Sequence, residues 1–192
     1  ERTETLFLTS ATLAVVDEAD GALRELQMRE TAGSRYRVAP AIASPFDYER
    51  NLEVVFLQDP TNPAALVDRM TRTVSTIARQ LGGRTLGLFT SRDRMIRVAD
   101  LLATDLGAEG IAVSTPAAGN SDPHELVRTF MENPRAVLLG SRAFWQGVDI
   151  PGDALQAVVI EKLPFDVPGD PLLEARAEAL FGRGGRVFVK TP

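Results

Sequence analysis

The amino-acid sequence predicts an α/β fold in which a parallel sheet is covered by helices on both faces. Short apolar runs of strand length alternate along the chain with longer segments whose apolar residues recur at helical spacing. A capping residue is followed by proline at Asn62-Pro63, Asp122-Pro123 and Asp170-Pro171, as at many helix starts. Such alternation is typical of a parallel sheet, and the 44% hydrophobic content is sufficient for one core of ordinary size.

The first predicted elements are a short strand at Leu6–Leu8 and a helix at Ala22–Arg29. Between them, residues 15–20 read VVDEAD, which by letter is a Walker B box for Mg²⁺. Acidic residues before a helix are also favourable against its dipole without any metal. We favour that second interpretation and assign no metal site here. A loop-like stretch then runs from Thr31 to Asn51.

The next elements are a strand at Val54–Leu57 and a helix that starts at Asn62-Pro63 and stops before Gly82. A strand is expected over Thr85–Phe89, and a second helix starts near Ser91. Each helix is predicted from an apolar stripe at spacings of three and four residues. The stripes are Leu66, Met70, Val74, Ile77 and Leu81 in the first helix, and Met95, Val98, Ala99, Leu102 and Leu106 in the second.

The second half of the chain repeats this order. A strand at Gly110–Val113 is followed by a helix that starts at Asp122-Pro123 and stops at Asn133-Pro134. Two more short apolar runs predict buried strands at Ala136–Leu139 and Gln156–Ile160. A last helix from Asp170 to Gly182 and a strand at Val187–Val189 complete the pattern.

Candidate binding residues follow the predicted strands, where ligands bind in parallel α/β sheets. Thr90, Ser91 and Arg92 come after one strand and offer hydroxyls, helix N–H groups and a positive charge to a phosphate. The alternative is that Thr90 or Ser91 is only the N-cap of the following helix. Lys162 follows another strand.

The connection between the predicted buried strands at Ala136–Leu139 and Gln156–Ile160 has the composition of a ligand-binding loop. Gly140, Ser141, Gly147 and Asp149 could bring backbone N–H groups close to a phosphate and accept a bond from a sugar hydroxyl. By spacing alone, an ordinary connector is an equally good interpretation. Trp145, the only tryptophan, could stack on a base, but we favour packing.

Four stretches in a fixed order resemble a known family. Residues 135–165 (RAVLLGSRAFWQGVDIPGDALQAVVIEKLPF) resemble motif V of DinG/XPD-type superfamily 2 DNA helicases. Residues 9–13 (TSATL) are similar to motif III, residues 44–51 (SPFDYERN) to the segment after it, and residues 88–102 (LFTSRDRMIRVADLL) to motif IV. The chain therefore resembles the second, RecA-like motor domain of a DinG-like helicase.

The resemblance implies roles for particular residues. Motif III couples nucleotide state to the grip on nucleic acid, through Thr9, Ser10 and Thr12 here. Motif V faces the nucleotide through Gly147 and Asp149. The remaining candidates are expected to contact single-stranded DNA: Thr90, Ser91, Arg92, Ser141, Arg142 and Lys162.

The resemblance also implies an arrangement of domains. Residues 1–43 would hold the motif III strand and an interdomain linker, and residues 44–192 the motor domain without motif VI. The chain starts at Glu1, not at Met, and contains no G-x-x-x-x-G-K-[ST] loop. We therefore expect it to be part of a longer protein whose first motor domain holds ATP and Mg²⁺, and to be inactive alone. Any iron–sulfur cluster would lie outside these residues, since cysteine is absent from the sequence.

The function implied is that of a cytoplasmic, ATP-dependent helicase that moves 5′ to 3′ on single-stranded DNA and unwinds duplex in repair or replication. The formal charge of −5 argues against a general polyanion-binding surface, so DNA contacts should form a local patch. Two alternatives remain open at this point: a non-catalytic RecA-like scaffold, and the motor half of a helicase-nuclease. No run is apolar and long enough to suggest a membrane span.

Overall fold

The computed structural model describes residues 42–57, 62–116 and 122–164. These residues belong to two compact units, one ending at Leu57 and the other beginning at Gln58. The elements predicted at residues 6–8, 22–29, 170–182 and 187–189 lie outside the described residues. The predicted domain boundary between residues 43 and 44 stays a prediction.

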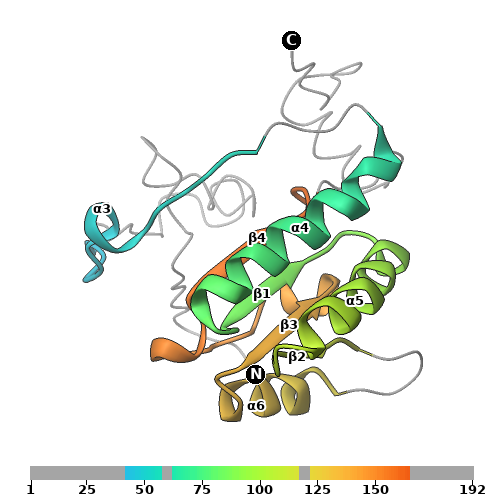
Figure 1. Cartoon of the computed structure of the whole chain (residues 1–192). Helices are drawn as coiled ribbons and strands as arrows, with labels where there is room; N and C mark the ends of the chain where they lie inside the picture. Colours follow the sequence, from blue (N-terminus) through green and yellow to red (C-terminus); the bar gives the residue numbers. More distant parts are fainter. Residues whose placement is uncertain (1–41, 58–61, 117–121, 165–192) are drawn as a thin grey trace, which may run out of the picture. The chain divides into compact units, whose positions relative to one another are not determined.

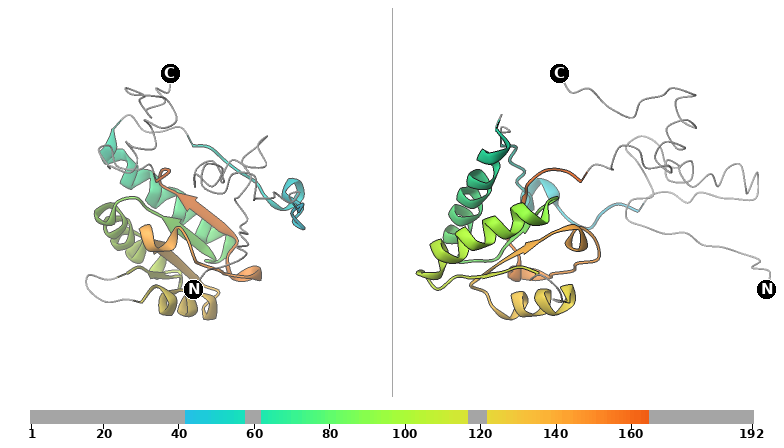
Figure 2. Two further views of the ribbon diagram at one scale, coloured as in Figure 1. Left: turned by 180° about the vertical axis from the view of Figure 1, so that it is seen from behind. Right: turned by 90° about the vertical axis from the view of Figure 1, so that its right-hand side faces the viewer.

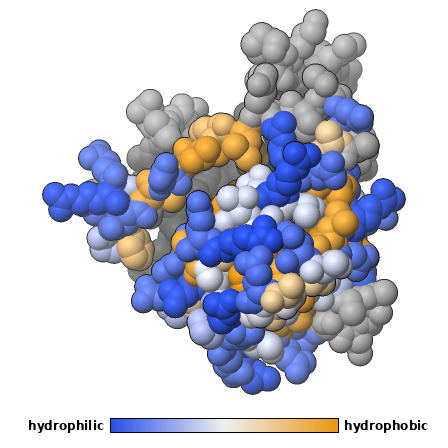
Figure 3. Space-filling model, in the orientation of Figure 1, coloured by the Kyte–Doolittle hydropathy of each residue, from blue (hydrophilic) through white to orange (hydrophobic). Residues whose placement is uncertain are grey.

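The described part of the first unit contains one helical turn, α3 (Tyr48–Asn51), capped by Asp47. The prediction of a strand at Val54–Leu57 is wrong, because these residues adopt no strand conformation. Their side chains are exposed, with Phe56 at 92%, and they form part of the apolar, orange surface in Figure 3. A strand needs a partner for its backbone groups, and no described segment pairs with this one.

In its described residues, the second unit contains a four-stranded sheet (Figure 1). Its strands are β1 (Thr85–Leu88), β2 (Ala112–Ser114), β3 (Ala136–Gly140) and β4 (Ala157–Ile160). They lie in the order β2-β3-β1-β4, and every neighbouring pair is parallel. The predicted parallel sheet is therefore confirmed, and it has the arrangement expected of a RecA-like domain.

In the described part of this unit, three helices connect and cover the strands, and they begin at the positions that the capping residues predicted. They are α4 (Pro63–Leu81), α5 (Arg92–Gly107) and α6 (Pro123–Glu132). The Asp122 carboxylate accepts a bond from the His124 N–H at 3.0 Å, which satisfies one free donor in the first turn of α6. All five apolar stripe residues predicted for α5 are buried. The helical periodicity of the sequence therefore placed these elements correctly.

The sheet separates two apolar clusters, because successive side chains of a strand point to opposite faces. On one face, Val137, Leu139 and Val159 pack against α4 and α5. On the other face, Leu86 and Leu138 pack against α6 and the segment that follows β3. Figure 2 shows α4 and α5 on one side of the sheet and α6 on the other. Helices thus cover both faces, as predicted.

The carboxyl ends of β1, β3 and β4 meet at one border of the sheet, which we call the carboxyl edge. The register aligns Leu88 of β1 with Gly140 of β3 and with Ile160 of β4. Two further backbone bonds extend this alignment, from the Phe89 N–H to Gly140 and from the Glu161 N–H to Leu88, each at 2.9 Å. The segments that leave these three strands therefore start side by side.

None of the helices in the described ranges is both long and apolar enough to cross a lipid bilayer.

Candidate nucleic-acid and nucleotide interface

The carboxyl edge brings together the segments that carry the predicted DNA-contacting residues. Thr90, Ser91 and Arg92 follow β1, Ser141 and Arg142 follow β3, and Lys162 follows β4. Of these residues, Ser91 and Ser141 are half-buried and the other four are exposed. Their gathering at one edge follows from the parallel register of the three strands. Their contacts with DNA stay a prediction.

The start of α5 has the geometry of a capped helix end. Ser91 is the N-cap, and its hydroxyl oxygen accepts a bond from the Arg94 N–H at 3.4 Å. The interpretation of Ser91 as a cap is therefore correct, and it is compatible with a further role because a hydroxyl oxygen can accept while its hydrogen donates. Arg92 is the first helical residue, and its side chain is exposed at the carboxyl edge.

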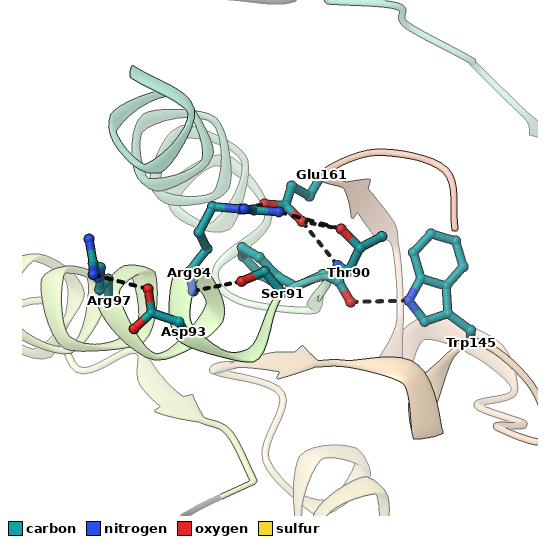
Figure 4. A network of polar contacts seen from close by, with 8 residues as sticks. Thr90, Ser91, Asp93, Arg94, Arg97, Trp145 and Glu161 are labelled. Carbon is teal, nitrogen blue, oxygen red and sulfur yellow. Dashed lines mark hydrogen bonds and ion pairs between the residues drawn. The ribbon is translucent and has the colours of Figure 1, made fainter. Parts of the chain in front are cut away.

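Thr90 has a partner that the sequence did not suggest. Its backbone N–H and its hydroxyl both donate to the Glu161 carboxylate, each at 3.0 Å. The other carboxylate oxygen of Glu161 accepts a bond from Nε of Arg94, which also forms an ion pair with it. Figure 4 shows Thr90 and Arg94 directed at Glu161. We call these three residues the Glu161 bracket, because they join the end of β4 to the start of α5.

The Glu161 bracket is a charged contact within the protein. The Glu161 side chain is 0% exposed, whereas the Arg94 side chain is 27% exposed. Burial alone would raise the pKa of Glu161, but the bonds donated by Arg94 and Thr90 outweigh burial and lower it. The bond with Glu161 raises the pKa of Arg94. Both groups are therefore held in their charged forms.

We expect the Glu161→Gln variant to be less stable than the wild type at neutral pH, by about 1.5–3 kcal/mol, the usual worth of hydrogen bonds to a charged group. The lowered folded-state pKa makes this difference fully present above the ordinary glutamate pKa of 4.5, and it should disappear as pH falls through the folded-state value. Urea unfolding from neutral to acidic pH measures it.

Asp93→Asn is the matched control for this measurement. Asp93 pairs with Arg97 at 3.0 Å, and both side chains are more than half exposed. An exposed pair within one helix contributes about 0.3–0.5 kcal/mol, so the control should change stability little. If Glu161→Gln lowers the free energy of unfolding no more than the control does, the Glu161 bracket stabilises the domain no more than an exposed ion pair.

The segment after β3 is held close to the sheet by a glycine. A β-carbon at Gly140 would lie 2.4 Å from the ring of Phe144, a distance that side chains do not tolerate. Phe144 is buried in the cluster on the α6 face and ends the short helix η2 (Arg142–Phe144). Glycine at position 140 therefore allows Ser141 and Arg142 to turn sharply at the carboxyl edge.

Trp145 packs within the domain, as predicted. Its ring is half-buried against the apolar cluster on the α6 face. The indole N–H donates to the Phe89 carbonyl at 3.3 Å, which connects the segment after β3 to the end of β1 (Figure 4). Trp145 therefore helps to fix the two segments relative to each other.

Gly147 and Asp149, the predicted nucleotide-facing residues, line a surface pocket beside the start of α6. Pro123 and His124 line the same pocket from the helix. Gly147 has a φ of 75°, a left-handed conformation that glycine adopts without strain. Asp149 and His124 are both exposed. A role of Gly147 and Asp149 toward nucleotide stays a prediction.

The described residues do not fit a site that holds Mg–ATP by itself. No three His, Cys, Asp or Glu side chains gather as possible metal ligands in the described part of the chain. The sequence also has no phosphate-binding G-x-x-x-x-G-K-[ST] loop. The candidate coupling residues Thr9, Ser10 and Thr12 lie outside the described residues.

Sequence reasoning missed Glu161 and Arg94. A usable signal was present, since a carboxylate directly after a buried parallel strand lies at the carboxyl edge. The partner of that carboxylate, 67 residues away in the chain, could be found only from the structure.

Comparison with known proteins gives one consistent result. Residues 74–191 match the model of the family described as "Helicase C-terminal domain". The chain is 32% identical to the 3′-5′ exonuclease DinG of Bacillus subtilis, over 97% of the chain and 20% of that protein. It is 32% identical to the ATP-dependent helicase DinG of Mycobacterium tuberculosis, over 96% of the chain and 27% of that protein.

A third relative is the ATP-dependent DNA helicase YoaA of Escherichia coli, which is 31% identical over 95% of the chain. The match covers 27% of that protein. The chain thus spans between a fifth and about a quarter of the length of these curated relatives.

Proposed function

Because the chain belongs to the helicase C-terminal domain family of DinG- and YoaA-type helicases, we propose that it is the second motor domain of an ATP-dependent DNA helicase. The longer protein would move along single-stranded DNA and unwind duplex. The observation that carries this proposal is the meeting of three chain segments at the carboxyl edge, beside which the family resemblance expects DNA.

The DNA contacts in this proposal are made to phosphates. Arg92, Arg142 and Lys162 supply positive charge at the carboxyl edge, and Ser91 and Ser141 supply hydroxyls. These residues are not spaced along one helix like the base-reading residues of a helix inserted in a groove, because they come from three separate segments. The proposed binding is therefore independent of DNA sequence.

The nucleotide in this proposal lies between two motor domains. The first motor domain of the longer protein would hold ATP and Mg²⁺, and Gly147 and Asp149 of this chain would face the nucleotide across the cleft. Closure of the two domains around ATP would move the carboxyl edge along the DNA backbone. The 5′-to-3′ direction, the role in repair or replication and the cytoplasmic location come from the family resemblance.

We expect Arg92→Ala, made in the longer protein, to weaken single-stranded DNA binding equally for all sequences. A lost phosphate contact also reduces the salt slope of log K by about 0.7 per contact on single strands. Fluorescence anisotropy with two unrelated oligonucleotides over a salt series measures both effects.

The matched control is Arg128→Ala. Arg128 lies in the second half of α6, near the strand starts, and pairs only within its helix, with Glu132 at 3.0 Å. This variant should bind DNA like the wild type. If Arg92→Ala leaves both affinity and salt slope unchanged, Arg92 does not contact the strand.

One observation favours a second candidate function, the motor half of a helicase-nuclease. The relative from Bacillus subtilis is named an exonuclease, and the chain covers only 20% of it. Incubating the longer protein and ATP with an end-labelled duplex that carries a single-stranded tail separates the two functions. Shortened products mean a nuclease, whereas intact strands with ATP-dependent duplex separation mean a helicase.

A further inference from the structure

The Glu161 bracket has the composition of an anion site. An N–H, a hydroxyl and a guanidinium, from Thr90 and Arg94, converge on one carboxylate at the start of α5. The same three kinds of donor bind phosphate oxygens in other proteins. The position expected for a DNA phosphate beside Thr90 is thus filled by an anion of the protein itself (Figure 4).

A DNA phosphate cannot easily displace the Glu161 carboxylate from these donors. Its side chain is wholly covered, and both of its oxygens accept bonds. A phosphate in its place would separate the carboxylate from Arg94 and leave a covered charge without a partner, which is strongly unfavourable. DNA contacts at this edge must therefore be made beside the Glu161 bracket, by residues that it holds in place.

We propose that Glu161 is a positioning residue for DNA binding, and that Thr90 acts on DNA through Glu161 and makes no phosphate contact. The Glu161 bracket fixes the start of α5 to the end of β4. Arg92 and Lys162, which lie two residues after Thr90 and one residue after Glu161, are thereby presented together. The inference rests on the proposed DNA-binding function.

If Glu161 acted only through its charge, its removal would change the DNA affinity in the opposite direction. A carboxylate near a DNA strand repels phosphates, so its removal without any positioning effect would strengthen binding. In this proposal, Glu161→Gln weakens binding instead, because Arg92 and Lys162 lose their fixed spacing. The sign of the change in affinity therefore separates a positioning role from a purely coulombic one.

The first test measures single-stranded DNA affinity of the longer protein by fluorescence anisotropy. Glu161→Gln is expected to weaken binding by about two- to thirtyfold, the range found for residues that act without touching the ligand. Asp93→Asn also removes one negative charge, but from a residue in the first turn of α5 that is not part of the Glu161 bracket. This control should bind as tightly as the wild type or tighter. Urea unfolding shows that each variant is folded under the binding conditions.

The second test is a double-mutant cycle with Thr90→Val, which removes the hydroxyl and keeps the shape of the side chain. If Thr90 acts through Glu161, Thr90→Val weakens DNA binding in the wild-type background and has little further effect in Glu161→Gln. If Thr90 contacts a phosphate itself, the loss is the same in both backgrounds. Should Glu161→Gln fail to fold, the cycle is run with Arg94→Gln in its place.

Three results would overturn the inference. Folded Glu161→Gln that binds DNA as tightly as the wild type, or tighter, shows that Glu161 positions nothing. Additive losses in the cycle show that Thr90 contacts the strand directly. Absence of DNA binding by the wild-type protein removes the proposed function and the inference together, whereas the first two results leave the proposed function intact.

Discussion

The 192-residue chain on its own is expected to hydrolyse no ATP above background, with or without single-stranded DNA. The sequence lacks both the phosphate-binding loop and motif VI, which in the family it resembles is a Q-G-x-G-R-x-I-R helix that bears the arginine finger. An arginine finger alone is worth about 10³–10⁵ in rate, so the loss of both parts leaves no measurable turnover. A coupled assay of the purified chain checks this.

The positive control is the proposed longer helicase, which should hydrolyse ATP and do so faster when single-stranded DNA is present. Robust hydrolysis by the 192-residue chain, stimulated by DNA, would show that it holds a complete ATP site. The interpretation of the chain as half of a motor would then be wrong.

The second large effect is expected at Asp149. In the longer protein, Asp149→Ala should lower kcat/KM for ATP by about five- to 150-fold, as the loss of about 1–3 kcal/mol on removal of one hydrogen-bond partner of the nucleotide predicts. The domain should stay folded, because the Asp149 side chain is exposed at the rim of the pocket beside α6. Steady-state ATPase kinetics and thermal unfolding of the same preparation measure the two quantities.

Asp153→Ala is the matched control, since Asp153 is also exposed and lies four residues further on, in the short helix η3 (Gly152–Ala154). It does not line the pocket that contains Asp149. This variant should turn over ATP like the wild type. Unchanged kinetics for Asp149→Ala, combined with a lowered melting temperature, would make Asp149 a structural residue of the loop.

The helices of the sheet domain could be predicted because local chemistry determines them. Asp122 and Pro123 fix the start of α6 whatever packs around it, since a cap bond and a proline φ act within one turn. The stripe of α5, from Met95 to Leu106, is buried in full because helical spacing places it on one face. Such features require no knowledge of distant residues.

Strands were predicted less well, because a strand exists only with its partner. Val54–Leu57 has the apolar composition of a strand, yet no described segment pairs with it, and its side chains are exposed. The strand predicted at Gly110–Val113 is observed as β2 at Ala112–Ser114, where it pairs with the start of β3. The ends of β2 depend on its register with β3, and the sequence of a single strand does not specify that register.

The candidate site, like the fold, could be predicted from the sequence only in part. The meeting of Thr90, Ser141 and Lys162 at one edge followed from the rule that parallel strands end together, and the register agrees with it. The occupation of both Thr90 donors by Glu161 did not follow, because 71 residues separate the two. The sequence thus predicted where the functional groups gather, and the structure showed which of them bond to one another.

Strand displacement by the longer protein tests whether this chain is one half of a DNA helicase motor. A labelled duplex with a 5′ single-stranded tail and a matched duplex with a 3′ tail are each incubated with the protein, with ATP or with a non-hydrolysable analogue. We expect the strands to separate only with ATP and only from the 5′-tailed duplex. Separation of neither duplex by a folded protein that binds single-stranded DNA would show that the chain is not half of a helicase motor.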